Sequence, residues 1–172
     1  MNEKRKLLIQ GAFMKPSIVG IGFICLLAGA SPLLAAEFPL ASCKGWNGTL
    51  VTRMGTNSRT AAIEGILTQA DVQEYCERDP GGETIAYGGK LTIDQCVSKY
   101  LKANSKDTFR STANCEDGAL SFYPSRGKGR RVEFPLPQDS DTSCASGMPP
   151  LIEQFKLLCP KAAQALKLMD SE

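Results

Sequence analysis

The sequence contains no histidine among its 172 residues. Serine and cysteine nucleophiles are commonly activated by a neighbouring imidazole, so hydrolases with Ser-His or Cys-His chemistry are excluded. Zinc hydrolases with an H-E-x-x-H helix are excluded for the same reason. Any catalysis by this chain must therefore rest on carboxylate, lysine, tyrosine or serine side chains alone.

The sequence also lacks the common metal and phosphate motifs. No C-x-x-C pair occurs, which argues against zinc-finger chemistry. The glycine-rich segment 75–96, YCERDPGGETIAYGGKLTIDQC, has carboxylates but not the alternating acidic pattern of an EF-hand loop. Its Gly89-Lys90 pair resembles the end of a phosphate-binding P-loop, but Thr84 stands where that motif needs its first glycine. The sequence therefore predicts neither a metal site nor a cofactor.

The N-terminus has the pattern of an export signal. Residues 1–15 carry four basic side chains and one acidic one, and the uncharged run 16–36 ends in small residues. This pattern predicts a cleaved signal peptide, residues 1–36, with cleavage after Ala36 or, as second choice, after Ala30. The alternative is an uncleaved membrane anchor, although glycines and Pro32 interrupt the run. We expect a periplasmic or secreted protein that meets the membrane only through this segment before cleavage.

Removal of this leader changes the charge balance. The full chain has a formal net charge of +2, and loss of four basic residues and one acidic residue leaves −1 for residues 37–172. The basic excess belongs to the leader, so bulk charge gives no indication of a nucleic acid partner.

Six cysteines remain after cleavage, and an even number in an exported chain predicts a disulfide framework. The first expected bridge joins the adjoining ends of two helices. The second joins the beginning and the end of the expected sheet region, and the third follows by elimination. We also expect the single tryptophan, Trp46, to pack against a disulfide. The predicted bridges are Cys76–Cys96, Cys115–Cys159 and Cys43–Cys144.

Apolar periodicity predicts a pair of helices in the first half of this domain. Residues 67–79 and 90–105 each carry a helical apolar stripe. Thr92 and Gln95 form a capping box at the start of the second helix. The segment 60–67 fits a helix and a strand equally well.

The pattern then changes to a period of two, which predicts three short strands at 107–115, 118–125 and 130–136. An earlier short strand is expected at 49–53. The segment 151–160 fits both periods, and a strand is preferred because Pro160 ends the run abruptly. The predicted fold class is α+β: a disulfide-stapled helical hairpin followed by a small antiparallel β-sheet and a C-terminal helix, in one domain, 37–172.

Two groups of charged side chains are candidate functional residues. Four basic residues at the tip of the last expected hairpin can bind an anion or an acidic partner, or can form a solvated turn that prevents aggregation. These are Arg126, Lys128, Arg130 and Arg131. Five carboxylates in and near the segment 75–96 are the candidate acids of a carboxylate-dependent hydrolase. These are Glu74, Glu77, Asp79, Glu83 and Asp94.

Four spaced motifs resemble a group of small exported proteins of unknown function from Gram-negative soil bacteria. The motifs are YCERDPGG at 75–82, QCV at 95–97, ANC at 113–115 followed by Gly118, and LCP at 158–160. The resemblance covers most of residues 68–160. It implies a scaffold made by the four cysteines of these motifs, with Cys43 and Cys144 as an added pair, and it implies no activity.

These observations together predict a non-catalytic periplasmic or secreted binding protein. Its role would be that of an envelope partner, a protein inhibitor or an envelope stress component, and its ligand a protein or an anionic envelope component. One alternative is a glycan or cell-wall hydrolase that uses two of the carboxylates. The other alternative is a structural scaffold of the envelope.

Overall fold

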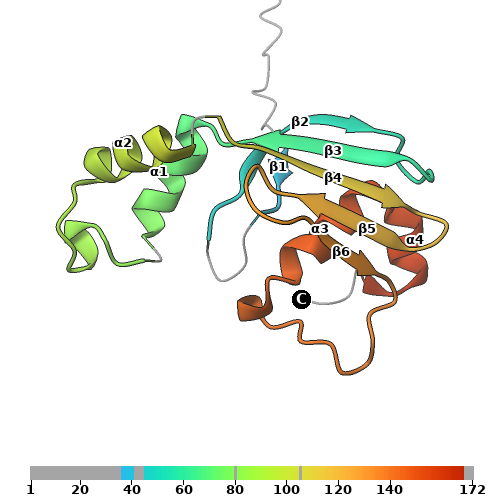
Figure 1. Ribbon diagram of the computed structural model, residues 1–172. Coiled ribbons are helices and arrows are strands. Elements are labelled where there is room, and N and C mark those ends of the chain that lie inside the picture. The colour runs from blue at the N-terminus through green and yellow to red at the C-terminus, as the bar shows by residue number, and fades with distance from the viewer. Residues whose placement is uncertain (1–35, 41–44, 80, 105, 169–172) are drawn as a thin grey trace, which may run out of the picture. The chain divides into compact units, whose positions relative to one another are not determined.

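The computed structural model describes residues 36–40, 45–79, 81–104 and 106–168, which all belong to one compact unit (Figure 1). The predicted signal peptide lies outside the described residues except for Ala36. Within these ranges, no helix combines the length and the apolar character that a bilayer crossing requires. The fold class is α+β, as the sequence predicts.

A six-stranded antiparallel sheet is the centre of the fold, and its strands lie side by side in sequence order (Figure 1). The predicted strands at 49–53, 107–115, 118–125 and 130–136 are all present. The ambiguous segment 60–67 is also a strand, paired on both sides. The strands are β1 (Glu37–Phe38), β2 (Gly48–Met54), β3 (Ala61–Ile66), β4 (Thr108–Asn114), β5 (Ala119–Tyr123) and β6 (Arg130–Glu133).

The helical hairpin is inserted into this sheet and does not precede it. Helices α1 (Gln69–Arg78) and α2 (Ile93–Asn104) lie in the chain between β3 and β4, which are neighbours in the sheet. Three strands therefore precede the hairpin: β2 is the strand expected at 49–53, β3 is the ambiguous segment 60–67, and β1 is a strand that the sequence did not indicate. The segment 60–67 is ambiguous in the sequence because it carries no clear alternation of polar and apolar residues.

Both helices of the hairpin begin at reciprocal side-chain caps. At α1, the Thr68 hydroxyl accepts from the backbone N–H of Asp71, and the Asp71 carboxylate accepts from the backbone N–H of Thr68 at 2.7 Å. At α2, Thr92 and Gln95 exchange the same pair of bonds, at 3.2 and 2.9 Å. Caps of this kind satisfy N–H groups that have no partner within the helix, so they fix where each helix starts.

The segment predicted as the last strand is instead a helix, α3 (Pro149–Leu158). Two prolines occupy its first turn, where a helix has no need of their missing N–H groups. Its buried residues include Leu151, Phe155 and Leu158, which share one helical face. This face covers β3, β4 and β5, and α4 (Pro160–Ala165) follows as the predicted C-terminal helix (Figure 1).

The main core lies between α3 and the sheet. Phe38 of β1, Ile63 of β3 and Leu120 of β5 are among its fully buried side chains. Gly65 makes room for Phe38, because a Cβ at that glycine would lie 2.6 Å from the phenylalanine ring. Because side chains alternate along each strand, every second residue of β3, β4 and β5 points to the sheet face opposite α3.

Two of the predicted disulfides are present. Cys76 and Cys96 join α1 to α2 with a Cα–Cα distance of 5.9 Å. Cys115 and Cys159 join the turn after β4 to the junction of α3 and α4, inside the main core. The third predicted pair includes Cys43, which lies outside the described residues; Cys144 is disulfide-bonded.

Candidate functional site

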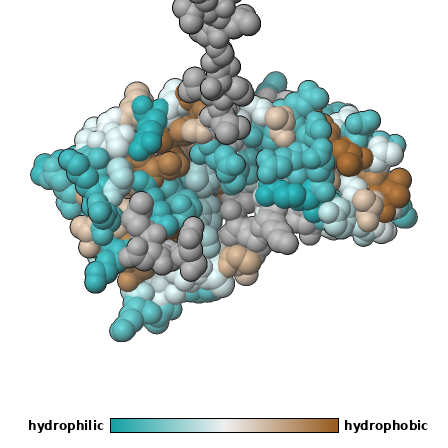
Figure 2. Space-filling model, turned by 180° about the vertical axis from the view of Figure 1, so that it is seen from behind, coloured by the Kyte–Doolittle hydropathy of each residue, from teal (hydrophilic) through white to brown (hydrophobic). Residues whose placement is uncertain are grey.

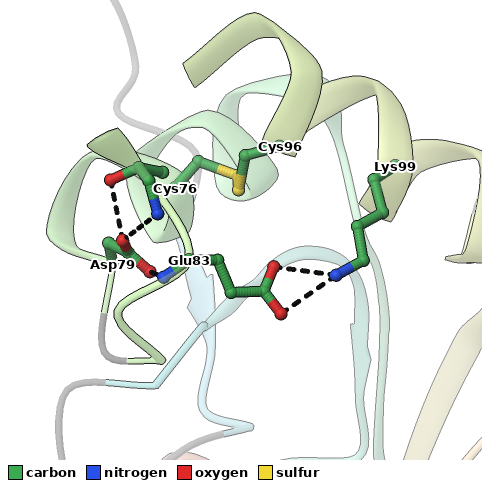
Figure 3. A network of polar contacts seen from close by, with 6 residues as sticks. Cys76, Asp79, Glu83, Cys96 and Lys99 are labelled. Carbon is green, nitrogen blue, oxygen red and sulfur yellow. Dashed lines mark hydrogen bonds and ion pairs between the residues drawn. A yellow bond between two sulfur atoms is a disulfide. The ribbon is translucent and has the colours of Figure 1, made fainter. Parts of the chain in front are cut away.

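The loop between α1 and α2 is organised by one buried carboxylate (Figure 3). Asp79 ends α1 in the left-handed conformation, with φ at 38°, and only 5% of the residue is exposed. Its carboxylate accepts from the backbone N–H groups of Glu83 and Thr84, at 2.9 and 2.6 Å. It also accepts from the Thr84 hydroxyl at 2.7 Å. Asp79 therefore closes the loop, and both of its carboxylate oxygens accept hydrogen bonds from loop residues.

The pKa of Asp79 reflects these contacts. Burial acts to raise the pKa, while hydrogen bonds from Thr84 and from the backbone N–H groups that follow act to lower it. The hydrogen bonds outweigh burial, so the pKa lies below the usual aspartate value. A general acid would need a raised pKa, which is the opposite shift.

Three of the other four candidate carboxylates make local contacts, and the fourth, Asp94, is exposed in the first turn of α2. Glu83 accepts two hydrogen bonds from Lys99 of α2, at 2.9 and 2.8 Å, and so ties the loop to that helix (Figure 3). Glu74 pairs with Arg78 one turn along α1, and Glu77 accepts from Gln73 at 2.8 Å. No cluster of three or more potential metal-ligating His, Cys, Asp or Glu residues occurs within the described ranges.

Trp46 packs against the disulfide-linked helical hairpin, as the sequence predicts. Its neighbours include the buried cluster that contains Cys76 and Cys96. Its ring lies 4.5 Å from that of Tyr75 and 5.2 Å from that of Tyr100, between ring centroids. Burial raises the pKa of the Tyr100 phenol, and a hydrogen bond with Tyr75 raises it further. The aromatic group is thus a second small core.

The basic cluster at the tip of the β5–β6 hairpin does not form one surface. Arg126 binds the carbonyl oxygen of Ala103 and pairs with Asp107. Arg130 donates to the carbonyl oxygens of residues 146 and 147, both at 3.2 Å. Arg131 lies on the opposite face of β6, because successive side chains of a strand alternate. Lys128 is exposed in the connecting loop.

A groove on the sheet face opposite α3 is the candidate site that brings three arginines together. Its volume is about 480 Å³, and its lining comes from β3 to β6 and from the turn before β3. Every charged residue in this lining is an arginine, and none of the five candidate carboxylates belongs to it. We call it the arginine groove; its lining includes Arg59, Arg110, Thr112, Ser121, Tyr123 and Arg131.

Strand register explains why the sheet is hollow here. Ala62, Thr112 and Ser121 lie directly opposite one another on β3, β4 and β5, and their short side chains form the floor. Arg131 of β6 ends this row opposite Ser121. In the next row, Arg110 stands opposite Tyr123, and these long side chains form a wall.

Each arginine of the groove has a glutamate neighbour that does not belong to the lining. These pairs are solvent-exposed, and exposed ion pairs typically contribute at most about 1 kcal/mol. An incoming anion can therefore compete for the guanidinium groups. The N···O distances are 2.5 Å for Arg59–Glu116, 3.7 Å for Arg110–Glu64 and 3.1 Å for Arg131–Glu133.

Exposed apolar side chains are a weaker candidate. Val51 and Met54 belong to β2, whereas Ile85 and Tyr87 belong to the short 3₁₀ helix η1 (Ile85–Tyr87) in the α1–α2 loop. Figure 2 shows that hydrophobic side chains on one face of the molecule lie in small patches between hydrophilic ones. The groove differs from these patches because it combines a hollow with a set of like charges.

Of the predicted binding residues, only Arg131 belongs to the arginine groove. The sequence did not single out Arg59 and Arg110, which come from a turn and from a different strand. The sequence of β4 holds one signal of the groove, because Arg110 and Thr112 alternate with Ser111 and Ala113. That alternation indicates that one face of the strand is polar, but it does not indicate which strands lie next to β4 in the sheet.

Comparison with known proteins gives no relative: no family model matches the chain, and no curated protein and no solved structure matches it. The assignment of function therefore depends on the chemistry of the site.

Proposed function

We propose that the protein is an exported, disulfide-stabilised binding domain without catalytic activity, which binds an anionic ligand in the arginine groove. The observation that carries this proposal is the charge of the lining, where all charged side chains are guanidinium groups. A guanidinium presents planar donors that match a carboxylate or a phosphate in pairs, and it stays charged at any physiological pH.

The contacts of the candidate carboxylates among the described residues support the non-catalytic part of the proposal. Hydrolysis by two carboxyl groups needs both of them to face one cleft. The carboxylates of the α1–α2 loop instead hold that loop, with Asp79 bound to Thr84 and Glu83 bound to Lys99. Turnover of peptidoglycan, a glycan or an ester by the purified protein would contradict this part.

Export to the periplasm or the cell exterior is supported by two features. Residues 1–36 have the three-part pattern of a signal peptide. The two described disulfides, one in each core, belong to a type of bond that persists in oxidising compartments. Fractionation of cells that produce the full chain tests export. Accumulation in the cytoplasm with reduced cysteines would contradict it.

Binding can be mapped directly on the arginines. The full chain is produced with its own N-terminal segment, and the exported, oxidised protein is labelled with ¹⁵N. It is titrated separately with oligogalacturonate, oligoglutamate and inorganic polyphosphate. We expect at least one of these anions to shift the Nε–H signals of Arg59, Arg110 and Arg131 together.

Two other arginines of the same chain are internal controls. Arg78 on α1 and Arg126 at the hairpin tip are outside the groove lining. Their Nε–H signals should move little at anion concentrations that saturate the groove. The proposal is wrong if none of the three anions shifts the groove signals, or if the control arginines respond equally.

A further inference from the structure

Two hydroxyl groups on the floor of the arginine groove narrow the class of ligand. Thr112 and Ser121 stand directly opposite each other on β4 and β5, and both are half-buried. Neither hydroxyl has a side-chain hydrogen bond to another described residue, in contrast to Ser111 one position away, which is bonded to Gln154. A half-buried hydroxyl can both donate and accept a hydrogen bond. The floor thus offers two such groups to a ligand.

One wall of the groove is an aromatic ring. Tyr123 ends β5 next to Arg110, and 51% of the residue is exposed. Gly129 lies close to this ring, since a Cβ at that glycine would be 3.3 Å from a ring carbon. An exposed tyrosine ring offers an apolar face together with a polar hydroxyl.

We propose that the anionic ligand of the proposed function is an acidic polysaccharide, an inference that rests on that function. One sugar ring would pack on Tyr123, and sugar carboxylates would bind the arginines. A sugar ring carries C–H groups on its face and hydroxyls around its edge. The face packs on the tyrosine, and the edge hydroxyls bond to Thr112 and Ser121. The uronic acid groups then meet Arg110 and Arg131 on either side of this floor.

Three other classes of ligand match only part of this lining. Inorganic polyphosphate satisfies the arginines but has no apolar face for Tyr123. An acidic peptide supplies carboxylates on flexible stems, and ordering each stem costs conformational entropy. A neutral glucan supplies rings and hydroxyls but no anion for the three guanidinium groups. Of these four ligand classes, a chain of acidic sugars is the one that uses the ring, the hydroxyls and the arginines together.

The test compares dissociation constants by calorimetry for oligogalacturonate, a maltooligosaccharide of equal length, oligoglutamate and inorganic polyphosphate. We expect oligogalacturonate to bind most tightly. Tyr123→Ala should weaken oligogalacturonate binding by about fivefold to tenfold, as expected for loss of one aromatic contact. The same substitution should leave any oligoglutamate binding nearly unchanged. Tyr123→Phe keeps the ring and should retain most of the affinity.

Tyr87→Ala is the matched control, because this tyrosine is 57% exposed but lies in η1, outside the groove. Equal losses for the Tyr123 and Tyr87 variants would overturn the inference, as would full affinity in Tyr123→Ala. Preference for polyphosphate or oligoglutamate overturns the sugar class while leaving an anion-binding groove in place. If none of the anions binds, the proposed function itself is wrong.

Discussion

Asp79 and Thr84 are bound to each other twice, through the backbone N–H and through the hydroxyl of the threonine, at 2.6 and 2.7 Å. Both residues are buried. Four residues lie between them in the sequence, namely a proline, two glycines and Glu83. The double contact therefore fixes Thr84 to the C-terminal end of α1.

The first prediction concerns the charge of Asp79. Asparagine also tolerates the left-handed conformation, so Asp79→Asn keeps the backbone while replacing one acceptor oxygen with a donor. We expect the variant to unfold several degrees lower than the native protein at pH 7. Glu77→Gln removes an exposed charge from the same region and should have little effect.

The pH dependence of this difference has a defined direction. The pKa of Asp79 in the folded protein lies below its usual value of about 3.9, so its contribution to stability is complete above that pH. The contribution is lost as pH falls through the lowered pKa. The melting difference between native protein and Asp79→Asn should therefore shrink on acidification below about pH 4. A difference that grows towards acid would contradict this assignment.

A second prediction concerns the two ends of the same loop. A Cβ at Gly89 would lie 2.0 Å from the backbone of Glu83, whereas the nearest atom to a Cβ at Gly81 is 3.8 Å away. Gly89→Ala should lower the free energy of unfolding by about 1–3 kcal/mol through overpacking. Gly81→Ala should change it by less than about 0.5 kcal/mol. Urea titration monitored by Trp46 fluorescence measures both, since this tryptophan packs on the hairpin.

A third prediction separates the two disulfides. The Cys76–Cys96 bridge spans 20 positions and the Cys115–Cys159 bridge spans 44. Loop entropy then assigns about 3 kcal/mol to the first and about 4 kcal/mol to the second. The double alanine variant of the first pair should alter Trp46 fluorescence while circular dichroism of the sheet persists. Removal of the second pair should unfold the sheet and α3 together. The existence of two separate cores would be contradicted if removal of the first pair unfolded the sheet and removal of the second pair changed only Trp46 fluorescence.

A fourth prediction concerns a buried contact between sheet and helix. The Ser111 hydroxyl donates to the Gln154 side-chain carbonyl at 2.6 Å, and the Gln154 amide donates to the Pro39 carbonyl oxygen at 2.6 Å. Ser111→Ala leaves a buried acceptor without a donor, which should cost about 1–3 kcal/mol of unfolding free energy. Thr112→Val, next in the strand but on the groove face, should cost less. Equal costs would argue against this orientation of β4.

Local signals were sufficient to predict the helical hairpin. Thr92 and Gln95 form the expected cap, and Thr68 and Asp71 form an equivalent one, because a cap depends only on residues within one turn. The same holds for the β5–β6 hairpin. The helix α3 could not be decided in this way, because residues 151–158 fit two periods. Contacts with residues far away in the sequence decide that this segment is a helix. The apolar face of α3 covers the sheet, and Gln154 is bonded to both Ser111 and Pro39.

The arginine groove was beyond local prediction for a related reason. Arg59, Arg110 and Arg131 come from three separate segments, and only strand register brings them to one hollow. The sequence emphasised the run at 126–131 because its charges are adjacent. In a strand, however, adjacent side chains point to opposite faces, so Arg130 and Arg131 are separated by the sheet.

The last prediction uses the glutamate beside the groove. Glu64 stands opposite Arg110 at 3.7 Å, and its carboxylate competes with any anion for this guanidinium. An exposed pair of this kind is typically worth about 0.2–1 kcal/mol, so Glu64→Gln should strengthen anion binding by about 1.4-fold to 5-fold. The gain should be largest at low salt, where charge interactions are least screened.

Glu74→Gln on α1 is the matched control for Glu64→Gln. It removes the same charge and also breaks an exposed pair, with Arg78 at 3.3 Å, but this pair is not part of the groove. Calorimetry with oligogalacturonate, oligoglutamate and polyphosphate at two salt concentrations compares the variants. A general change of net charge would strengthen binding equally in both. A gain confined to Glu64→Gln places the bound anion beside Arg110, and weaker binding in that variant would contradict the proposed site.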